Sequence, residues 1–236
     1  MNAHDAIPNT ARRANLQRLA ALGLLGPAGI SGLIQEALAA GDMPAIPGIN
    51  RIEGTATVNG APAKVGTPVK PGDTVATGKV SMAVVVISGD AFLLRESSTI
   101  TFKGKGDILD EVIVAAGKLL SVFSKRRTAS LKVATRSATI GIRGTGMYLE
   151  SVEKNRDYFC LCYGEAVVEG KGMSPQTLKT THHEAPVWLD QGGNAMKLEP
   201  GPFLNHTDAE LIVLESLVGR KPPFWNPNYD PRTTRY

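Results

Sequence analysis

The sequence predicts a mostly β fold, and three observations lead to this prediction. First, the 236 residues include 25 Gly and 15 Pro, which favours many turns. Second, from Gly48 onward apolar residues alternate or form short β-branched runs, without a helical period. Third, dipeptides that favour tight turns, such as Asn59-Gly60 and Gly72-Asp73, separate these runs. We expect about 12 short strands in a sheet wrapped on itself, as a roll, a sandwich or a short β-helix, with an N-terminal signal helix and one C-terminal helix.

The first segment, residues 1–39, has the pattern of an export signal. Arg12-Arg13 precede a moderately apolar stretch, Leu19–Leu33, and Ala37-Leu38-Ala39 places small residues at the −3 and −1 positions of a cleavage site. Paired arginines with moderate hydropathy are typical of a twin-arginine signal. A leading helix packed on the domain, or an uncleaved membrane anchor, would be the alternative. We therefore expect bacterial-type export and a periplasmic or otherwise extracytoplasmic location.

After a linker at residues 40–49, the main β domain is expected over residues 50–170. Its most distinctive run, Ser81–Ile87, is almost continuously β-branched, which is typical of a strand buried on both faces. The expected strands are Arg51–Val58, Val65–Val69, Val75–Thr77, Ser81–Ile87, Ala91–Glu96, Thr99–Phe102, Val112–Ala115, Lys118–Phe123, Ser130–Thr135, Thr139–Ile142, Met147–Val152, Tyr158–Tyr163 and Glu165–Glu169.

The C-terminal part is expected to contain a loop-rich extension, a helix and a tail. The extension covers residues 171–203 and the extended tail covers residues 220–236. Between them, residues 204–219 have Leu211, Leu214 and Leu217 on one helical face. Thr207 or Asn205 can cap this helix, which we expect to pack on the β domain.

Composition and motifs argue against several classes of function. The net charge of +4 is small and dispersed, and the one dense basic run, residues 125–127, lies where a turn is expected. Neither pattern favours nucleic-acid binding. The sequence has no Gly-x-Ser-x-Gly elbow, phosphate-binding Walker loop or His-Glu-x-x-His motif. We therefore expect a protein that is not an enzyme.

Two cysteines and two adjacent histidines form the candidate chemical site. Cys160 and Cys162 lie on one expected strand, and His182 and His183 follow it; His206 is a third, more distant imidazole. Thiolates and imidazoles are the ligands that zinc, iron and copper prefer, so a zinc or iron ion is the expected cofactor if the site binds one. Adjacent histidines on extended backbone point to opposite faces, so only one would readily join the thiols.

Geometry leaves other interpretations of the cysteines open. On a regular strand, residues two apart lie roughly 6.5–7 Å apart, whereas zinc requires sulfur atoms within about 4 Å of each other. A β-bulge near Tyr163-Gly164 could close part of that gap. Otherwise both cysteines would be small buried hydrophobic residues and the histidines loop residues, or one thiol would pair with another protein.

A series of segments resembles the FecR-domain family, the extracytoplasmic domain of ferric-citrate regulators. The order and spacing of these segments match as well as their letters over about residues 50–170. They are Gly54–Gly60, Val69–Gly78, Ser88–Leu94, Ala116–Leu119, Val133–Thr135 and Ala138–Thr145. The most recognisable residues are expected to be structural, at turns and bends, with the Thr145 hydroxyl satisfying a backbone group. They are Gly72, Asp73, Arg143, Gly144, Thr145 and Gly146.

This resemblance implies an extracytoplasmic domain that binds a partner in signalling or envelope assembly. About ten residues precede Arg12-Arg13, too few for a sigma-factor-binding region, so we expect a stand-alone exported member without an anti-sigma role. The leading prediction is a non-enzymatic binding or scaffold protein of the cell envelope, whose partner is an envelope or periplasmic protein. No integral membrane domain is expected beyond an uncleaved signal anchor. The alternative is a metal-binding or redox protein that uses the Cys/His cluster, and a carbohydrate-binding module ranks last.

Overall fold

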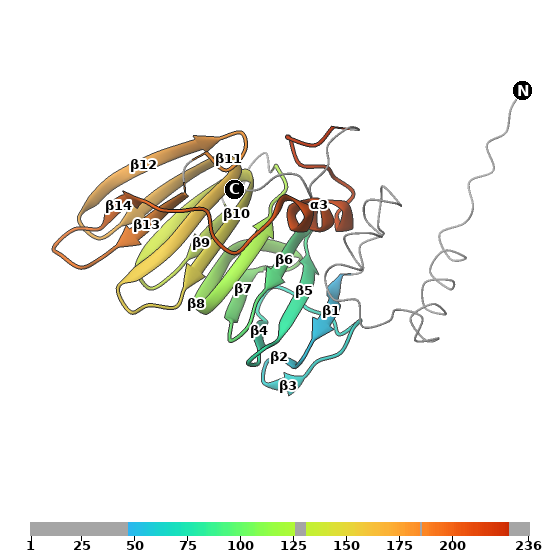
Figure 1. Cartoon of the computed structure of the whole chain (residues 1–236). Coiled ribbons are helices and arrows are strands. Elements are labelled where there is room, and N and C mark those ends of the chain that lie inside the picture. Colours follow the sequence, from blue (N-terminus) through green and yellow to red (C-terminus); the bar gives the residue numbers. More distant parts are fainter. Residues whose placement is uncertain (1–46, 126–130, 185, 227–236) are drawn as a thin grey trace, which may run out of the picture.

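The structure is a computed structural model that describes residues 47–125, 131–184 and 186–226. The predicted signal segment 1–39 lies outside the described residues, as do most of the linker and the end of the tail. The described chain forms fourteen strands in one hydrogen-bonded, mixed and open sheet, followed by one helix (Figure 1). This confirms the predicted mostly β fold with a C-terminal helix.

The elements are β1 (Gly48–Glu53), β2 (Ala56–Val58), β3 (Ala61–Pro62), β4 (Thr74–Thr77), β5 (Met82–Ile87), β6 (Asp90–Leu94), β7 (Thr99–Lys105), β8 (Ile108–Val122), β9 (Leu131–Ala134), β10 (Ala138–Ser151), β11 (Arg156–Gly170), β12 (Met173–Thr180), β13 (Pro186–Asp190), β14 (Lys197–Pro200) and α3 (Asp208–Leu217).

Three long strands, β8, β10 and β11, change partners halfway along their length. The first half of β8 pairs with β7 and β9, whereas its second half pairs with β6 and β10. In β10 the first half pairs with β9 and the second with β8. In β11 the first half pairs with β13 and the second with β12. The three strands therefore pass from one layer of the folded sheet to the other, with β5, β6 and β13 on one side and β7, β9 and β12 on the other.

A glycine with positive φ lies at each of these crossing points. Gly117 in β8, Gly144 in β10 and Gly164 in β11 have φ of 98°, 60° and 95°. Because glycine adopts this conformation without a Cβ clash, the strand bends there and its ladder continues. This explains why Val112–Ala115 and Lys118–Phe123, predicted as separate short strands, belong to one strand, β8.

The main hydrophobic core lies between the two layers. It contains Phe92, Leu119 and Phe159 from one layer and Phe102, Val133 and Ile140 from the other, all fully buried. A second apolar cluster covers the outer face of β5, β6 and β8 and includes Leu211, Leu214 and Leu217 of α3. The predicted apolar face of the helix therefore packs on the β domain.

The helix α3 has Thr207, one of the two predicted capping residues, as its N-cap. The Thr207 side chain accepts a hydrogen bond from the Glu210 backbone N–H, and the Glu210 carboxylate accepts one from the Thr207 backbone N–H. This reciprocal capping box satisfies two amide groups at the start of the helix. With 10 residues, α3 is too short to cross a membrane, and no other described helix could do so.

Further expectations about the strands are wrong. The extension at 171–203 contains three strands, β12, β13 and β14, although it was expected to be rich in loops. Most of β12 is exposed on both faces, so its sequence carries no alternating apolar signal. Conversely, Val65–Val69 is not a strand. Gly66 lies in a turn with a φ of 85°, and its backbone N–H donates to the carbonyl of Ile49 in β1.

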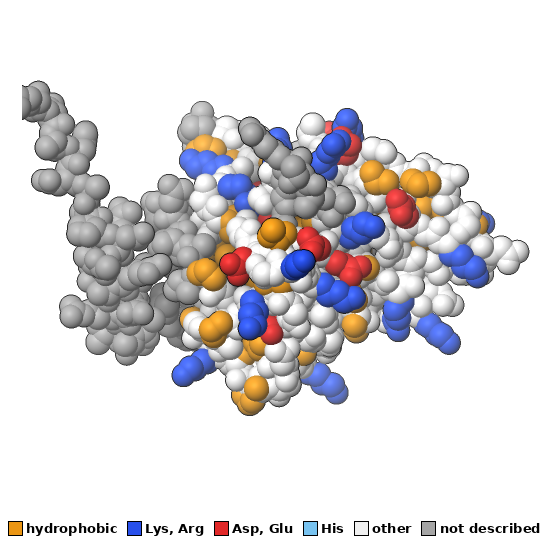
Figure 2. All heavy atoms as spheres, turned by 180° about the vertical axis from the view of Figure 1, so that it is seen from behind, with side chains coloured by type: hydrophobic (Ala, Val, Ile, Leu, Met, Phe, Trp, Pro, Cys, Tyr) orange, Lys and Arg blue, Asp and Glu red, His pale blue; other side chains and the backbone are white. Residues whose placement is uncertain are grey.

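The surface seen from behind shows no large patch of one kind of side chain. Figure 2 shows Lys and Arg side chains spread over this face with Asp and Glu between them, and hydrophobic atoms in small, separate groups. Exposed apolar residues such as Val80 and Ile108 are far apart in the sequence and lie in turns or at a strand end. On the described part of this face, the hydrophobic atoms form no single continuous patch.

Candidate metal centre

The two thiols of the candidate site come from the first half of β11. In the ladder with β10, Leu161 pairs with Met147 and Tyr163 pairs with Gly146, so Cys162 has no partner in β10. Cys162 therefore occupies a β-bulge. A bulge bends the strand and redirects a side chain, so the sulfur atoms can approach more closely than on a regular strand. The Cys162 thiol lies 3.8 Å from the carbonyl oxygen of Cys160.

Two histidines from different parts of the chain complete the cluster. His183 follows β12 in a turn with a φ of 52°, and its backbone N–H donates to the Cys162 carbonyl at 2.9 Å. His206 lies in the segment between β14 and α3. Together the four residues bring two thiol sulfurs, His183 Nδ1 and an imidazole nitrogen of His206 within 4.8 Å of one another, and all four are buried.

The distances between these donor atoms match a tetrahedral zinc site. Zn–N bonds of about 2.05 Å and Zn–S bonds of about 2.3 Å place ligand atoms about 3.3 Å apart for two nitrogens and about 3.6 Å apart for nitrogen and sulfur. In the structure His183 Nδ1 lies 3.2 Å from His206 Nε2 and 3.6 Å from Cys160 Sγ. Two of the six distances between donor atoms therefore have tetrahedral spacing, and the four residues could hold a metal ion.

Each histidine is oriented by a second partner on its outer nitrogen. His206 Nδ1 lies 2.6 Å from the Leu204 carbonyl, and His183 Nε2 lies 2.9 Å from Asp208 Oδ1. Because a carbonyl only accepts hydrogen bonds, His206 must carry its proton on Nδ1, which leaves a lone pair on Nε2. Metal-ligating histidines characteristically donate their other N–H to a carboxylate or a carbonyl, as both do here.

The surroundings of the cluster favour the thiolate form of Cys160 and the protonated form of His183. The hydrogen bond from Cys162, together with His183 and His206, holds the pKa of the Cys160 thiol well below its usual range, although burial opposes this. Burial alone lowers the pKa of His183, but Asp208 and Cys160 outweigh it and raise that pKa overall. A divalent ion bound by the four residues would supply positive charge beside the Cys160 thiolate.

The prediction about the histidines needs correction. His182, predicted as a ligand with His183, is not part of the four-residue cluster, and His206 takes its place. His182 Nε2 instead lies 2.9 Å from an oxygen of Asp208, at the side of the cluster that faces solvent. His182 and His183 do not point apart, contrary to expectation, because His183 has a φ of 52° and is not extended. Both rings reach Asp208, and their centroids lie 5.1 Å apart. The position of His206 depends on how α3 docks, and no spacing in the sequence indicates it.

The six family-motif residues lie at turns and around the layer crossing, and none of them is a donor of the cluster. Asp73 accepts hydrogen bonds from the Asn59 side chain and the Lys70 backbone N–H, which joins two turns. Arg143 is largely exposed, and Gly144 lies at the bend in β10. Thr145 is buried, but its hydroxyl has no hydrogen-bond partner among the described residues, contrary to expectation. The remaining two are Gly72, which has a φ of 105°, and Gly146, where a Cβ would collide with the Tyr163 ring.

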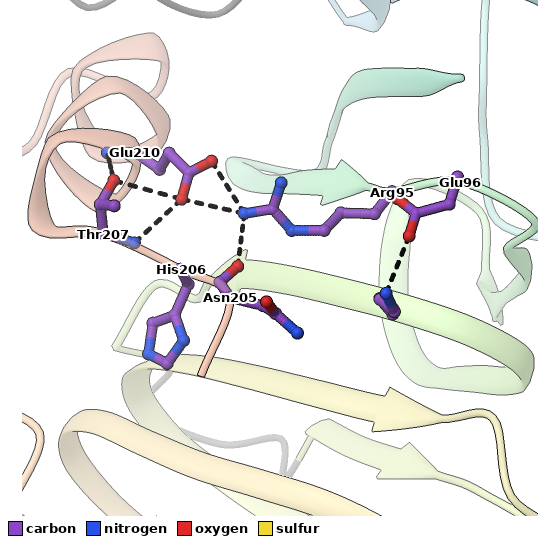
Figure 3. Close-up of a pocket in the computed structure, with 7 residues that line it drawn as sticks. Arg95, Glu96, Asn205, His206, Thr207 and Glu210 are labelled. Atoms are coloured by element: carbon purple, nitrogen blue, oxygen red, sulfur yellow. Dashed lines mark hydrogen bonds and ion pairs between the residues drawn. The ribbon is translucent and has the colours of Figure 1, made fainter. Parts of the chain in front are cut away.

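A polar cavity of about 430 Å³ lies beside His206, at the N-terminus of α3 (Figure 3). The Arg95 guanidinium reaches from the end of β6 and donates to Glu210 at 2.8 Å and to the Asn205 carbonyl at 2.6 Å. Lys118 pairs with Glu96 at 2.8 Å, so the charges of the cavity are balanced. These contacts tie the segment that carries His206 to the sheet.

Comparison with known proteins gives a limited result. No protein-family model and no curated protein matches the chain. Two solved structures with similar folds are both described as a putative anti-sigma factor from Parabacteroides distasonis ATCC 8503. The first has a TM-score of 0.46 and 12% identity, and the match covers 54% of this chain and 59% of that one. The second has a TM-score of 0.47 and 12% identity, and covers 59% and 70%.

Proposed function

We propose that this chain is a zinc-binding β module in which Cys160, Cys162, His183 and His206 hold a structural Zn²⁺ ion. The observation that carries this proposal is the convergence of four buried donor atoms whose two histidines are each oriented by an outer acceptor. Two thiolates and two imidazoles with tetrahedral spacing favour zinc over calcium or magnesium, which prefer oxygen ligands.

The closed character of the cluster favours a structural ion over a catalytic one. A catalytic zinc site uses three protein ligands and keeps a fourth position for water or substrate. Here four protein donors are available, and all four residues are at most 6% exposed. An ion held in this way has no free position for a substrate.

The ion would connect three segments that are distant in the sequence. Cys160 and Cys162 belong to β11, His183 to the turn after β12, and His206 lies one residue before the N-cap of α3. A metal bond to His206 therefore holds the start of α3 on the outer face of the sheet. Metal binding to a site that exists only in the folded state contributes its free energy to folding.

For the molecule as a whole, we propose a non-enzymatic binding or scaffold role in the bacterial cell envelope. The sequence patterns that resemble the FecR domain support this role, and so does the export signal predicted at Arg12-Arg13. The zinc ion would then keep the module rigid. The molecule that the module binds is expected to be a protein of the periplasm or envelope.

Metal analysis of the purified full chain tests the zinc site. Native protein is expected to contain about one zinc ion per chain by mass spectrometry of the elements, because four donors saturate the tetrahedral ion. Cys160→Ser and His206→Gln should each lose most of the metal. Ser121→Ala is the matched control, since Ser121 is buried in β8 outside the cluster and should leave the zinc content unchanged.

A second measurement uses the unmodified chain, so it does not depend on whether the variants fold. When Co²⁺ replaces zinc in the unmodified chain, a tetrahedral site with two thiolates should give intense thiolate-to-cobalt charge-transfer bands. Folded protein with neither zinc nor these bands would overturn the proposal.

A further inference from the structure

All four donors of the metal cluster are buried, so an ion must enter through neighbouring side chains. The cluster residues Cys160, Cys162, His183 and His206 have relative exposures between 0% and 6%. Beside them, the side chain of His182 is 26% exposed. This imidazole is therefore a metal-ligating group that both solvent and the cluster can reach.

A single carboxylate connects the exposed histidine to the cluster. His182 Nε2 lies 3.0 and 2.9 Å from the two oxygens of Asp208. The same carboxylate lies 2.9 Å from Nε2 of His183, whose Nδ1 faces the thiols. The donor atoms of His182, His183 and Asp208 lie within 4.8 Å of one another, so they form a second group with metal-ligand chemistry.

We propose that His182 and Asp208 form a transient entry site for a divalent metal ion, which passes from there to the buried cluster. This inference rests on the zinc site proposed above. The entering ion takes the lone pair of His182 Nε2 and one Asp208 oxygen, and the proton that joined these two groups goes to solvent. After the ion has moved inward to the four donors, a proton from solvent restores the hydrogen bond between His182 and Asp208.

An aromatic ring covers the entry site. Phe224 stacks on the His182 ring with a centroid distance of 4.3 Å and an interplanar angle of 26°. It also packs edge-on against Tyr163, with ring centroids 6.0 Å apart. The ring lies in the segment after α3, so movement of that segment would uncover His182. Phe224 is therefore placed to limit the rate at which metal enters and leaves.

Negative charge near the opening would favour a cation. The exposed Glu184 carboxylate accepts hydrogen bonds from the backbone N–H and the hydroxyl of Thr181. A carboxylate close to His182 raises the local concentration of divalent cations.

Metal-exchange kinetics test this inference. Full-length protein stripped with a chelator is mixed with Zn²⁺ in a stopped-flow instrument, and release is followed into excess chelating dye. A group that acts only in the transition state of entry changes both rates equally and leaves Kd unchanged. His182→Gln should therefore slow association and dissociation by about tenfold each, which is about 1.4 kcal/mol of lost transition-state stabilisation.

Two further variants complete the test. Phe224→Ala should accelerate both rates, because the cover is removed. Trp225→Ala is the matched control, since this neighbouring ring contacts Lys221 at 3.7 Å, and both rates should stay as in the unmodified chain.

The possible outcomes separate the two proposals. Absence of zinc from the unmodified chain overturns the zinc site itself. Zinc binding with rates unaffected by His182→Gln overturns the entry site alone, and so does a weaker Kd with an unchanged association rate, because His182 would then stabilise the bound state only.

Discussion

Gly164 packs against the backbone of Gly144 where β10 and β11 cross between layers. A Cβ on Gly164 would meet the Gly144 carbonyl oxygen at 2.7 Å and Thr145 Cγ2 at 2.8 Å. Its φ of 95° is also unfavourable for any residue with a Cβ. This position also lies two residues after Cys162, so the crossing and the metal cluster depend on the same stretch of backbone.

At the residue scale we therefore predict that Gly164→Ala is strongly destabilising. It should lower the free energy of unfolding by about 2–4 kcal/mol, as the sum of backbone strain and overpacking. Urea unfolding of the zinc-loaded protein measures this. Gly60→Ala is the control, because Gly60 has a φ of 80° but no atom within 4 Å of the position that a Cβ would take, and it should lose only about 1 kcal/mol. Equal losses in the two variants would contradict the role assigned to the crossing.

At the scale of elements, α3 is held on the sheet by three kinds of contact. Its leucines pack on β5, β6 and β8. Arg95 joins the first turn to β6 through Glu210. The histidine cluster holds the helix start through His206 and through Asp208, whose side chain is fully buried. Of these three contacts, only the cluster would be strengthened by the proposed ion.

Removal of zinc should therefore loosen α3 selectively. After chelation of the full chain, amide hydrogen exchange in Leu211–Leu217 is expected to become about ten- to hundredfold faster, because local opening no longer requires breaking a metal bond. Exchange in the central strand β8 should change little. The same chelator added to Cys160→Ser, which lacks the ion, should have no further effect. Identical exchange of α3 in loaded and stripped protein would show that the cluster does not hold the helix.

At the scale of the whole molecule, the folded sheet and its helix form one unit from β1 to α3 (Figure 1). Its core lies between two layers joined by three strands that continue through both. The envelope location proposed for this protein depends on the export signal predicted in residues 1–39.

Export can be tested by fractionating cells of a host with a twin-arginine pathway. Replacing Arg12-Arg13 by Lys-Lys should leave unprocessed precursor in the cytoplasm, because this pathway recognises the arginine pair. The equivalent change at Arg126-Arg127 serves as the control and should not alter the location. Normal amounts of mature periplasmic protein in the first variant would rule out this route.

The sequence by itself determined the features that depend on neighbouring residues. Turn dipeptides and β-branched runs predicted a mostly β fold, and Thr207 or Asn205 indicated the start of the helix, because turns and caps are made by residues a few positions apart. The Cys-x-Cys pair and the adjacent histidines likewise pointed to metal chemistry. Strands without alternation, such as β12, carried no such local signal.

Tertiary structure decided what depends on long-range approach. It continued β8, β10 and β11 through both layers, and it placed a bulge at Cys162 that brings the thiols together. It also chose His206 over His182 as the fourth donor. The physical reason is that His206 reaches the cluster only when α3 docks on the sheet, and docking depends on apolar packing that no spacing between ligand residues records.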